Sequence, residues 1–125
     1  MLLNDNMKET LFIGYPKCST CQKAYQALEN LGIHATYRDI TKDNPTKEEI
    51  QSWIDQGVSL DKLFNTSGMK YRELNVKEKR QSASQKELIE LLASDGMLVK
   101  RPIVIQGDTI IVGKKEKEYA LLEKA

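Results

Sequence analysis

The chain has 125 residues, of which 40% are hydrophobic and 30% charged, with 19 Lys and Arg against 18 Asp and Glu. This composition predicts a single globular domain spanning residues 1–125 and argues against an intrinsically disordered protein. The net charge of +1 gives no electrostatic case for direct binding to nucleic acid or a membrane surface, and no apolar run has the length of a membrane span.

The first third of the chain has a β-α-β pattern. Residues 1–8 are interpreted as a flexible lead-in without the apolar core of a secretory signal, so the cytosol is the expected compartment. Residues 10–15 are typical of a buried strand, residues 19–31 carry apolar side chains at helical spacing, and residues 35–40 predict a second strand. Two strands joined through one helix favour a right-handed parallel crossover.

The middle of the chain predicts a helical insertion from about residue 45 to residue 98. Two capping boxes, each a hydroxyl residue followed three positions later by glutamate, mark helix starts: Thr46 with Glu49, and Ser84 with Glu87. Gly57 and Gly96 are expected to end these two helices, because glycine is the usual residue after a helix C-terminus. Shorter helical turns are expected between them.

The last part of the chain predicts a hairpin and a helix. Two β-branched runs within Pro102–Gly113 flank Gly107-Asp108, a typical hairpin turn, and residues 115–125 are helical in pattern. The whole order is β-α-β, a helical insertion, then β-β-α. The expected fold class is therefore α/β, a thioredoxin-like fold with a four-stranded mixed sheet and an insertion between its two halves.

The only two cysteines, Cys18 and Cys21, form a C-x-x-C motif where the first predicted strand gives way to a helix. The unpaired amides and dipole of a helix N-terminus stabilise a thiolate, so Cys18 is the candidate attacking sulfur and Cys21 the candidate resolving one. Two buried free thiols are one alternative. A zinc site is another, although zinc normally takes four ligands and His34 is the only histidine.

Arg101 and Pro102 form a second candidate group. A trans proline that opens a strand is the default interpretation of Pro102, since few X–Pro bonds are cis. In the thioredoxin layout, however, a proline here is cis and lies against the C-x-x-C motif. Arg101 would then lie near the thiols, where its fixed charge favours a thiolate or an anionic substrate. An ordinary solvated arginine is the alternative.

The C-S-T-C motif after a strand, together with "LVKRPIVIQGD" near the end, resembles the ArsC/Spx family from about Thr10 to Leu122. These are arsenate-reductase-like proteins of thioredoxin fold, and "FNTSGMKYRELN" looks like their small Firmicute-type branch. The resemblance implies that Cys18 is the nucleophile, Cys21 the second cysteine of the Spx-like branch, and Arg101-Pro102 the R-P pair beside the substrate. It implies a thiol–disulfide oxidoreductase with no bound cofactor, which uses an external thiol donor such as glutathione with glutaredoxin, or thioredoxin.

The same resemblance leaves two other functions open. A redox-sensing Spx-type regulator would bind the RNA polymerase α-subunit, and Gly57 lies in a place comparable to a glycine that helps that contact. A true arsenate reductase would need further arginines, yet Ser67-Gly68 and Gly113 lie near their expected places, with Arg72 the only nearby substitute. Arsenate reduction is therefore expected to be absent or weak.

Overall fold

The protein is represented by a computed structural model that describes residues 9–124, so the predicted lead-in, residues 1–8, lies outside the described part. The chain divides into two compact units. The first, called here the sheet unit, combines the residues up to Asp39 with those from Arg101 onward. The second, called here the helical unit, runs from Ile40 to Lys100 and contains the predicted insertion.

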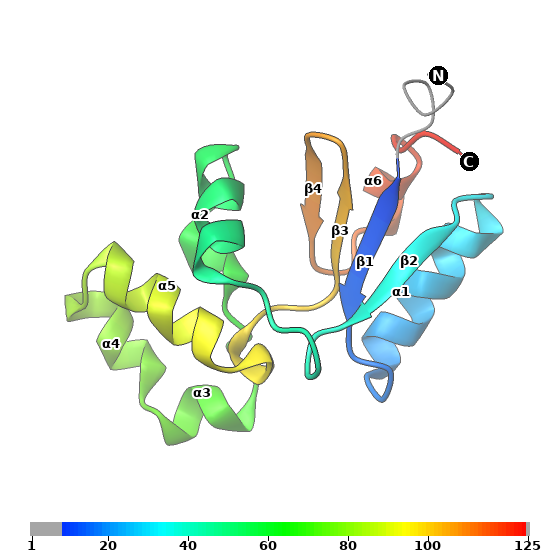
Figure 1. Ribbon diagram of the computed structural model, residues 1–125. Coiled ribbons are helices and arrows are strands. Elements are labelled where there is room, and N and C mark those ends of the chain that lie inside the picture. Colours follow the sequence, from blue (N-terminus) through cyan, green and yellow to red (C-terminus); the bar gives the residue numbers. More distant parts are fainter. Residues whose placement is uncertain (1–8, 125) are drawn as a thin grey trace. The chain divides into compact units, whose positions relative to one another are not determined.

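The sheet unit is built on a four-stranded mixed sheet with the order β2-β1-β3-β4 (Figure 1). The strands are β1 (Thr10–Gly14), β2 (Ala35–Asp39), β3 (Ile103–Gln106) and β4 (Thr109–Val112). Strand β1 runs parallel to β2 and antiparallel to β3, and β4 runs antiparallel to β3. The predicted α/β layout, β-α-β followed by an insertion and β-β-α, is confirmed.

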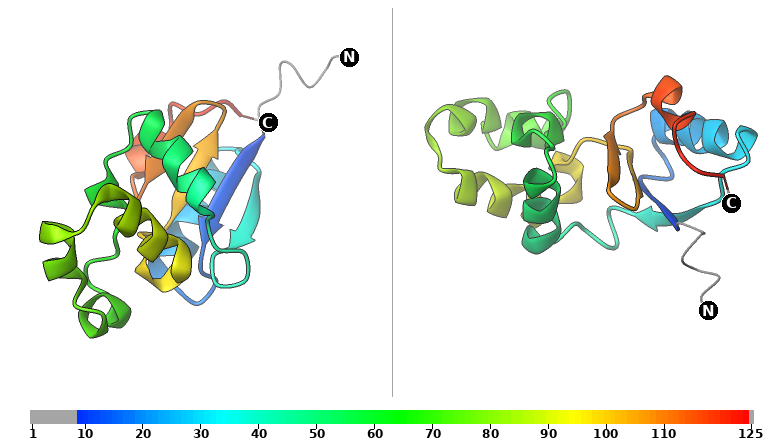
Figure 2. Two further views of the ribbon diagram at one scale, coloured as in Figure 1. Left: turned by 60° about the vertical axis from the view of Figure 1, so that its left-hand side comes forward. Right: turned by 90° about the horizontal axis from the view of Figure 1, so that it is seen from above.

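Helices α1 (Ser19–Asn30) and α6 (Glu116–Tyr119) lie on the same face of this sheet (Figure 2). The strand register aligns Phe12, Val104 and Ile111 across β1, β3 and β4, so these side chains share that face. The core beneath the helices consists of nine buried residues: Phe12, Cys21, Ala24, Leu28, Ile33, Val104, Ile111, Tyr119 and Leu122. Cys21 is therefore part of the packed core as well as of the C-x-x-C motif.

The hairpin turn is where the sequence predicts it, at Gly107-Asp108, and Gly107 has a φ of 58°. Positive φ at the first central residue of a two-residue loop matches the twist of the flanking strands and favours glycine. The sheet unit therefore closes with a tight β3–β4 pair.

The predicted closing helix over residues 115–125 is wrong in length, because α6 ends at Tyr119. The Gln106 side chain accepts a hydrogen bond from the Glu123 backbone N–H at 2.8 Å and donates one to the Glu123 carbonyl at 2.9 Å. A longer helix would need the Glu123 N–H for its own backbone hydrogen bonds, but Gln106 binds it instead. Gln106 also donates to the Thr10 hydroxyl at 2.8 Å, so its buried amide is fully used.

The helical unit contains α2 (Lys47–Asp55), η2 (Leu60–Leu63), α3 (Met69–Glu73), α4 (Val76–Ser82), α5 (Gln85–Ser94) and η3 (Gly96–Leu98). Both predicted capping boxes are confirmed, with the hydroxyl accepting from the glutamate N–H and the carboxylate accepting in return. Trp53 packs in the core, at 5% exposure, as its position on the apolar face of α2 predicts.

The two glycines predicted to end helices behave differently. Gly57 follows the last residues of α2 with a φ of 107°, a conformation that favours glycine. Gly96 does not end α5, which stops at Ser94; it begins η3 instead. A Cβ on Gly96 would lie 2.5 Å from the carbonyl oxygen of Ile40, so glycine is needed there for close backbone packing.

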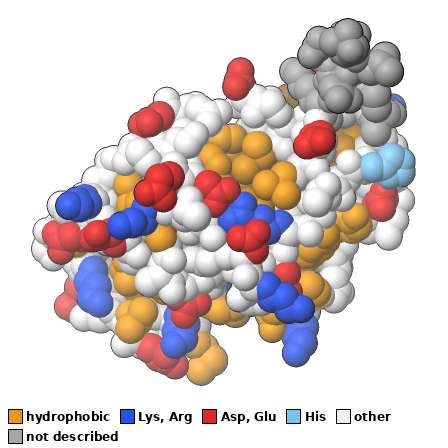
Figure 3. Space-filling model, in the orientation of Figure 1, with side chains coloured by type: hydrophobic (Ala, Val, Ile, Leu, Met, Phe, Trp, Pro, Cys, Tyr) orange, Lys and Arg blue, Asp and Glu red, His pale blue; other side chains and the backbone are white. Residues whose placement is uncertain are grey.

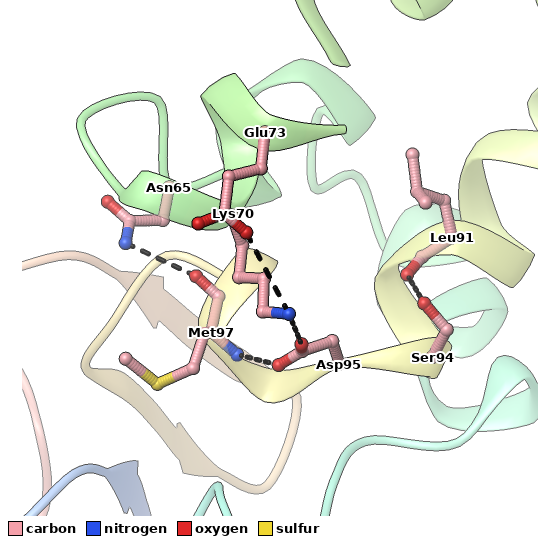
Figure 4. A network of polar contacts seen from close by, with 7 residues as sticks. All are labelled: Asn65, Lys70, Glu73, Leu91, Ser94, Asp95 and Met97. Atoms are coloured by element: carbon pink, nitrogen blue, oxygen red, sulfur yellow. Dashed lines mark hydrogen bonds and ion pairs between the residues drawn. The ribbon is translucent and has the colours of Figure 1, made fainter. Parts of the chain in front are cut away.

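Polar contacts tie α3 to the turn that follows α5 (Figure 4). Asp95 accepts a hydrogen bond from the Met97 N–H at 2.8 Å and faces the Lys70 ammonium at 3.9 Å. Asn65 donates to the Met97 carbonyl at 3.3 Å. The two hydrogen bonds to Met97 satisfy backbone groups that η3, a short helix, leaves open.

Charged side chains of both signs are interspersed on the face drawn in Figure 3, with no large area of one sign. This mixture agrees with the nearly neutral formal charge of +1. Within residues 9–124, none of the helices combines the length and the apolar composition that crossing a bilayer would require.

Candidate active site

The C-x-x-C motif lies where β1 leads into α1. Cys18 is the N-cap residue of α1, with extended backbone at φ −89° and ψ 120°. Its N–H donates to the Tyr15 carbonyl at 2.9 Å, and its carbonyl accepts from the Gln22 N–H at 3.0 Å. Cys21 lies in the first turn of α1. Both thiols are free; Cys18 is partly exposed and Cys21 is fully buried, which is the expected arrangement of an accessible and a shielded sulfur.

The first turn of α1 leaves its amides open to the Cys18 sulfur. No side chain caps this helix, and no acidic residue stands in its first turn. Burial alone would raise the pKa of Cys18, but the Cys21 amide, the Cys21 thiol, the Thr20 amide and the charge of Arg101 together lower that pKa overall. Cys18 is therefore the sulfur that ionises more readily.

Cys21 has the opposite electrostatic environment. Burial raises the pKa of Cys21 to about 11, although the Tyr15 N–H contacts its sulfur at 3.5 Å and favours the thiolate. The Cys21 thiol donates to the Cys18 sulfur, which keeps the proton on Cys21 while Cys18 is charged. At neutral pH the pair thus consists of an activated Cys18 and a protonated Cys21.

Arg101 belongs to the same site. Its positive charge lowers the pKa of both cysteines, although it is not the largest influence on either. Its guanidinium carbon lies 5.9 Å from the centroid of the Tyr15 ring, within the range of a cation–π contact. The charge of Arg101 therefore acts on both thiols, and its contact with an anionic substrate stays a prediction.

The bond between Arg101 and Pro102 is cis, as the thioredoxin layout predicts, so the default trans interpretation is wrong. The Pro102 carbonyl accepts a hydrogen bond from the Gly113 N–H at 2.7 Å, which fixes the base of the hairpin. Direct packing of Pro102 against the thiols stays a prediction.

Three residues next to the thiols were not anticipated from the sequence: Gly14, Tyr15 and Tyr37. A Cβ on Gly14 would lie 2.6 Å from the Phe12 ring, 3.0 Å from the Tyr37 hydroxyl and 3.3 Å from the Cys21 sulfur. Glycine is thus needed at position 14, because a side chain there would clash with its neighbours. The position of Tyr37 follows from its pairing with Phe12, which the sequence could have suggested only if the strand register had been known.

The other residues considered from the sequence lie away from the thiols or take part in different contacts. His34 is 75% exposed and faces the Glu29 carboxylate at 3.2 Å. Within residues 9–124, no three His, Cys, Asp or Glu side chains gather as metal ligands would. Arg72 is an exposed residue of α3 and Ser67-Gly68 precedes that helix, all in the helical unit, whereas Gly113 follows β4.

Comparison with known proteins finds a matching family profile, similar proteins and a similar solved structure. The profile of the ArsC family matches residues 13–122. "Uncharacterized protein YusI" of Bacillus subtilis is 50% identical over 109 residues, which cover 86% of this chain and 92% of that protein. "Global transcriptional regulator Spx 1" of Bacillus cereus is 32% identical over 104 residues, or 82% of this chain and 78% of the regulator. The structure of a "possible arsenate reductase" from Streptococcus mutans is 41% identical with a TM-score of 0.79, covering 86% of this chain and 92% of the other.

Proposed function

Because the chain belongs to the ArsC family, we propose that it is a thiol–disulfide oxidoreductase in which Cys18 attacks and Cys21 resolves. The observation that carries this proposal is the contrast between the two thiols. Cys18 is partly exposed with a lowered pKa, while Cys21 is buried with a pKa raised to about 11. An attacking and a resolving sulfur need that division of accessibility and acidity.

The reaction proceeds through two exchanges. The Cys18 thiolate attacks one sulfur of a substrate disulfide, so a mixed disulfide forms and the other substrate sulfur leaves as a thiolate that takes up a proton. Cys21 then loses its proton to water and attacks the Cys18 sulfur. The Cys18–Cys21 disulfide forms, the second substrate thiol is released, and the substrate has gained two electrons.

Arg101 and Pro102 form the substrate side of the proposed site. The charge of Arg101 favours the Cys18 thiolate and would attract an anionic substrate or donor.

An external thiol, either glutathione with glutaredoxin or thioredoxin, returns two electrons to the Cys18–Cys21 disulfide. No bound cofactor enters this cycle, and a reducing compartment such as the cytosol would supply the donor.

A coupled turnover assay tests the proposal. The protein is supplied with a disulfide substrate such as hydroxyethyl disulfide and with thioredoxin plus its reductase, or glutaredoxin plus glutathione. We expect multiple turnovers that disappear in Cys18→Ser. If neither donor supports more than one turnover per molecule, the pair does not serve a catalytic cycle and the enzyme proposal fails.

A redox-switched regulator is the second candidate, and its support is the 32% identity to Spx 1 over 82% of the chain. In this proposal the Cys18–Cys21 pair is a sensor, and the helical unit carries the contact to the α-subunit of RNA polymerase. Gly57 is exposed, and apart from its chain neighbours no atom of residues 9–124 lies within 4 Å of where its Cβ would be. A pull-down with the C-terminal domain of the α-subunit, in oxidised and in reduced buffer, should recover a stoichiometric complex if this function holds.

Arsenate reduction is the third and least supported candidate. The sequence lacks arginines at Ser67-Gly68 and Gly113, where further oxyanion contacts would be expected from the family. We expect no saturable arsenate turnover with glutaredoxin and glutathione, or with thioredoxin. Robust turnover with either donor would show that the chain holds the oxyanion with other residues.

A further inference from the structure

Beside the thiols lies a cluster of three aromatic rings. The Phe12, Tyr25 and Tyr37 centroids are separated by 5.0 to 5.2 Å, in tilted and edge-on arrangements. Phe12 and Tyr37 are directly paired across β1 and β2, and Tyr25 comes from α1. Ring packing of this kind restricts each ring to one orientation. The Tyr37 hydroxyl is therefore held in a defined position.

Three tyrosines of the sheet unit, Tyr25, Tyr37 and Tyr119, differ in their hydrogen bonds. The Tyr25 hydroxyl donates to the Ala35 carbonyl at 3.1 Å, and the Tyr119 hydroxyl donates to the Gly113 carbonyl at 3.5 Å. The Tyr37 hydroxyl is buried, and within residues 9–124 it has no hydrogen-bond partner. Leaving a buried hydroxyl unpaired costs free energy, so an unpaired group at a reactive site calls for a functional explanation.

The unpaired hydroxyl and the resolving sulfur line the same small space. The Tyr37 oxygen and the Cys21 sulfur are 3.0 and 3.3 Å from one point, the position that a Cβ on Gly14 would occupy. Glycine at this position leaves the space beside both atoms open. Any larger residue would enter that space and also overlap the Phe12 ring, whose nearest carbon lies 2.6 Å from the same point.

We propose that the Tyr37 hydroxyl stabilises the negative charge on the Cys21 sulfur by donating a hydrogen bond to it when Cys21 reacts. This inference rests on the proposed exchange chemistry of Cys18 and Cys21. In the resting state the Cys21 thiol donates to Cys18 and offers Tyr37 no charge. The need for a donor arises only once Cys18 is bound in a mixed disulfide and Cys21 must ionise.

Tyr37 keeps its own proton throughout this step. Burial, and next the charge that Cys21 would carry, raise the pKa of Tyr37 to about 12, so the phenol is a donor at neutral pH. The Cys21 proton passes to water, the Cys21 thiolate attacks the Cys18 sulfur, and the substrate thiolate leaves and is protonated. In the reverse direction a donor thiolate attacks Cys18, and Cys21 leaves as a thiolate that Tyr37 again stabilises.

Several other groups also act electrostatically on Tyr37 and Cys21. The groups that act electrostatically on Tyr37 are Cys21, Asp39, Cys18 and Tyr25, and those that act on Cys21 include Cys18 and Arg101. Arg101 affects both cysteines, whereas Tyr37 interacts more strongly with Cys21 than with Cys18. Loss of the hydroxyl should therefore affect the second chemical step and leave the first unchanged.

The test uses dithionitrobenzoate as probe and follows the release of thionitrobenzoate in single turnover. The first equivalent reports attack by Cys18, and the second reports resolution by Cys21. In Tyr37→Phe we expect the second phase to slow by about tenfold, the size typical of a hydrogen bond to a charged group. Its pH midpoint should rise, and the first phase should keep its rate.

Tyr25→Phe and Tyr119→Phe are the matched controls, because each removes one tyrosine hydroxyl that is already bonded to a carbonyl. Thermal unfolding confirms that each variant is folded. An unchanged or faster second phase in Tyr37→Phe, or equal slowing in the controls, overturns the inference. If instead the protein shows no turnover with thioredoxin or glutaredoxin, the proposed function fails while both probe phases remain measurable.

Discussion

The first turn of α1 differs from the first turns of α2 and α5 in what binds its backbone amides. Helices α2 and α5 begin with complete capping boxes, Thr46 with Glu49 and Ser84 with Glu87, which add acidic side chains to the first turn. Helix α1 begins with Cys18, has no side-chain cap and carries no acidic residue in its first turn. The same structural position is thus occupied by a stabilising cap in two helices and by a thiol in the third.

The difference shows how the chain separates stability from reactivity. A capping box satisfies two amides and adds negative charge near the positive end of the dipole, which stabilises the helix. At α1 the corresponding amides lower the pKa of Cys18 instead. Because no carboxylate competes for these amides, the thiolate receives the full stabilisation of the helix start.

The largest expected effect comes from replacing the thiol with a true capping residue. In Cys18→Ser, exchange should fall to the uncatalysed rate, because a hydroxyl does not provide the thiolate that attacks disulfides. Serine is a preferred N-cap, so the free energy of unfolding should rise by up to about 1 kcal/mol. Disulfide exchange and urea unfolding measure the two effects.

Cys21→Ser is the control for that variant, because it removes a thiol without altering the N-cap. It should retain the first attack and lose resolution. A Cys18→Ser protein that still exchanged disulfides would contradict the assignment of Cys18.

The second effect concerns the pH dependence of the two thiols. Alkylation of Cys18, followed in Cys21→Ser, should reach half its maximal rate below pH 8.5, about the value of a free thiol, because its pKa is lowered. Alkylation of Cys21, followed in Cys18→Ser, should keep rising above that pH, because burial raises the pKa of Cys21. We expect iodoacetamide to modify Cys18 at least about tenfold faster at pH 7. A faster Cys21 would reverse the assigned roles.

A smaller effect is expected where the cap serves stability alone. Thr46→Ala removes the hydroxyl that accepts from the Glu49 N–H at 3.0 Å, and should lower the free energy of unfolding by about 1 kcal/mol. The alkylation rate of Cys18 should not change. Thr66→Ala, at an exposed threonine before α3, is the matched control and should cost less. Equal losses in both variants would mean that the capping box contributes nothing specific.

The smallest effect tests the missing acidic residue. Ser19→Glu gives α1 the first-turn carboxylate that α2 and α5 already have, and should raise the pKa of Cys18 by a few tenths of a unit, about 0.3–1 kcal/mol of dipole interaction. Cys18 alkylation at pH 7 should slow slightly. Gln26→Glu makes the same charge change further along α1 and should leave the rate unchanged; an equal slowing there would point to net charge instead.

Local features of this fold could be predicted from the sequence. Both capping boxes, the Gly107-Asp108 turn and the placement of Cys18 at a helix start depend on residues within a few positions of one another. Hydrophobic spacing was enough to identify the strands and the longer helices. The resemblance to a known family added Arg101 and the cis bond before Pro102, which local patterns alone would have assigned as trans.

Features that depend on distant pairing were missed. The Gln106–Glu123 bonds shorten α6, but they join residues 17 positions apart and leave no local signal. Gly96 resembles a helix stop in the sequence, because close packing against the Ile40 backbone cannot be inferred from glycine alone. Tyr37 lies on the Cys21 side of the sheet only because β2 pairs with β1 in one register, and a shift of one residue would turn its side chain to the other face.

The Gln106 amide also sets a limit for anyone who shortens or extends this chain. Its oxygen and nitrogen bind the backbone of Glu123, and the side chain is 3% exposed, so water has little access to replace those bonds. A truncated variant ending at Leu122 would leave the Gln106 oxygen and one of its two N–H groups unsatisfied, at a cost of about 1–3 kcal/mol for each. The chain can therefore be trimmed or fused to an affinity tag after residue 123, whereas a boundary drawn before it would weaken the sheet at Thr10, more than a hundred residues away.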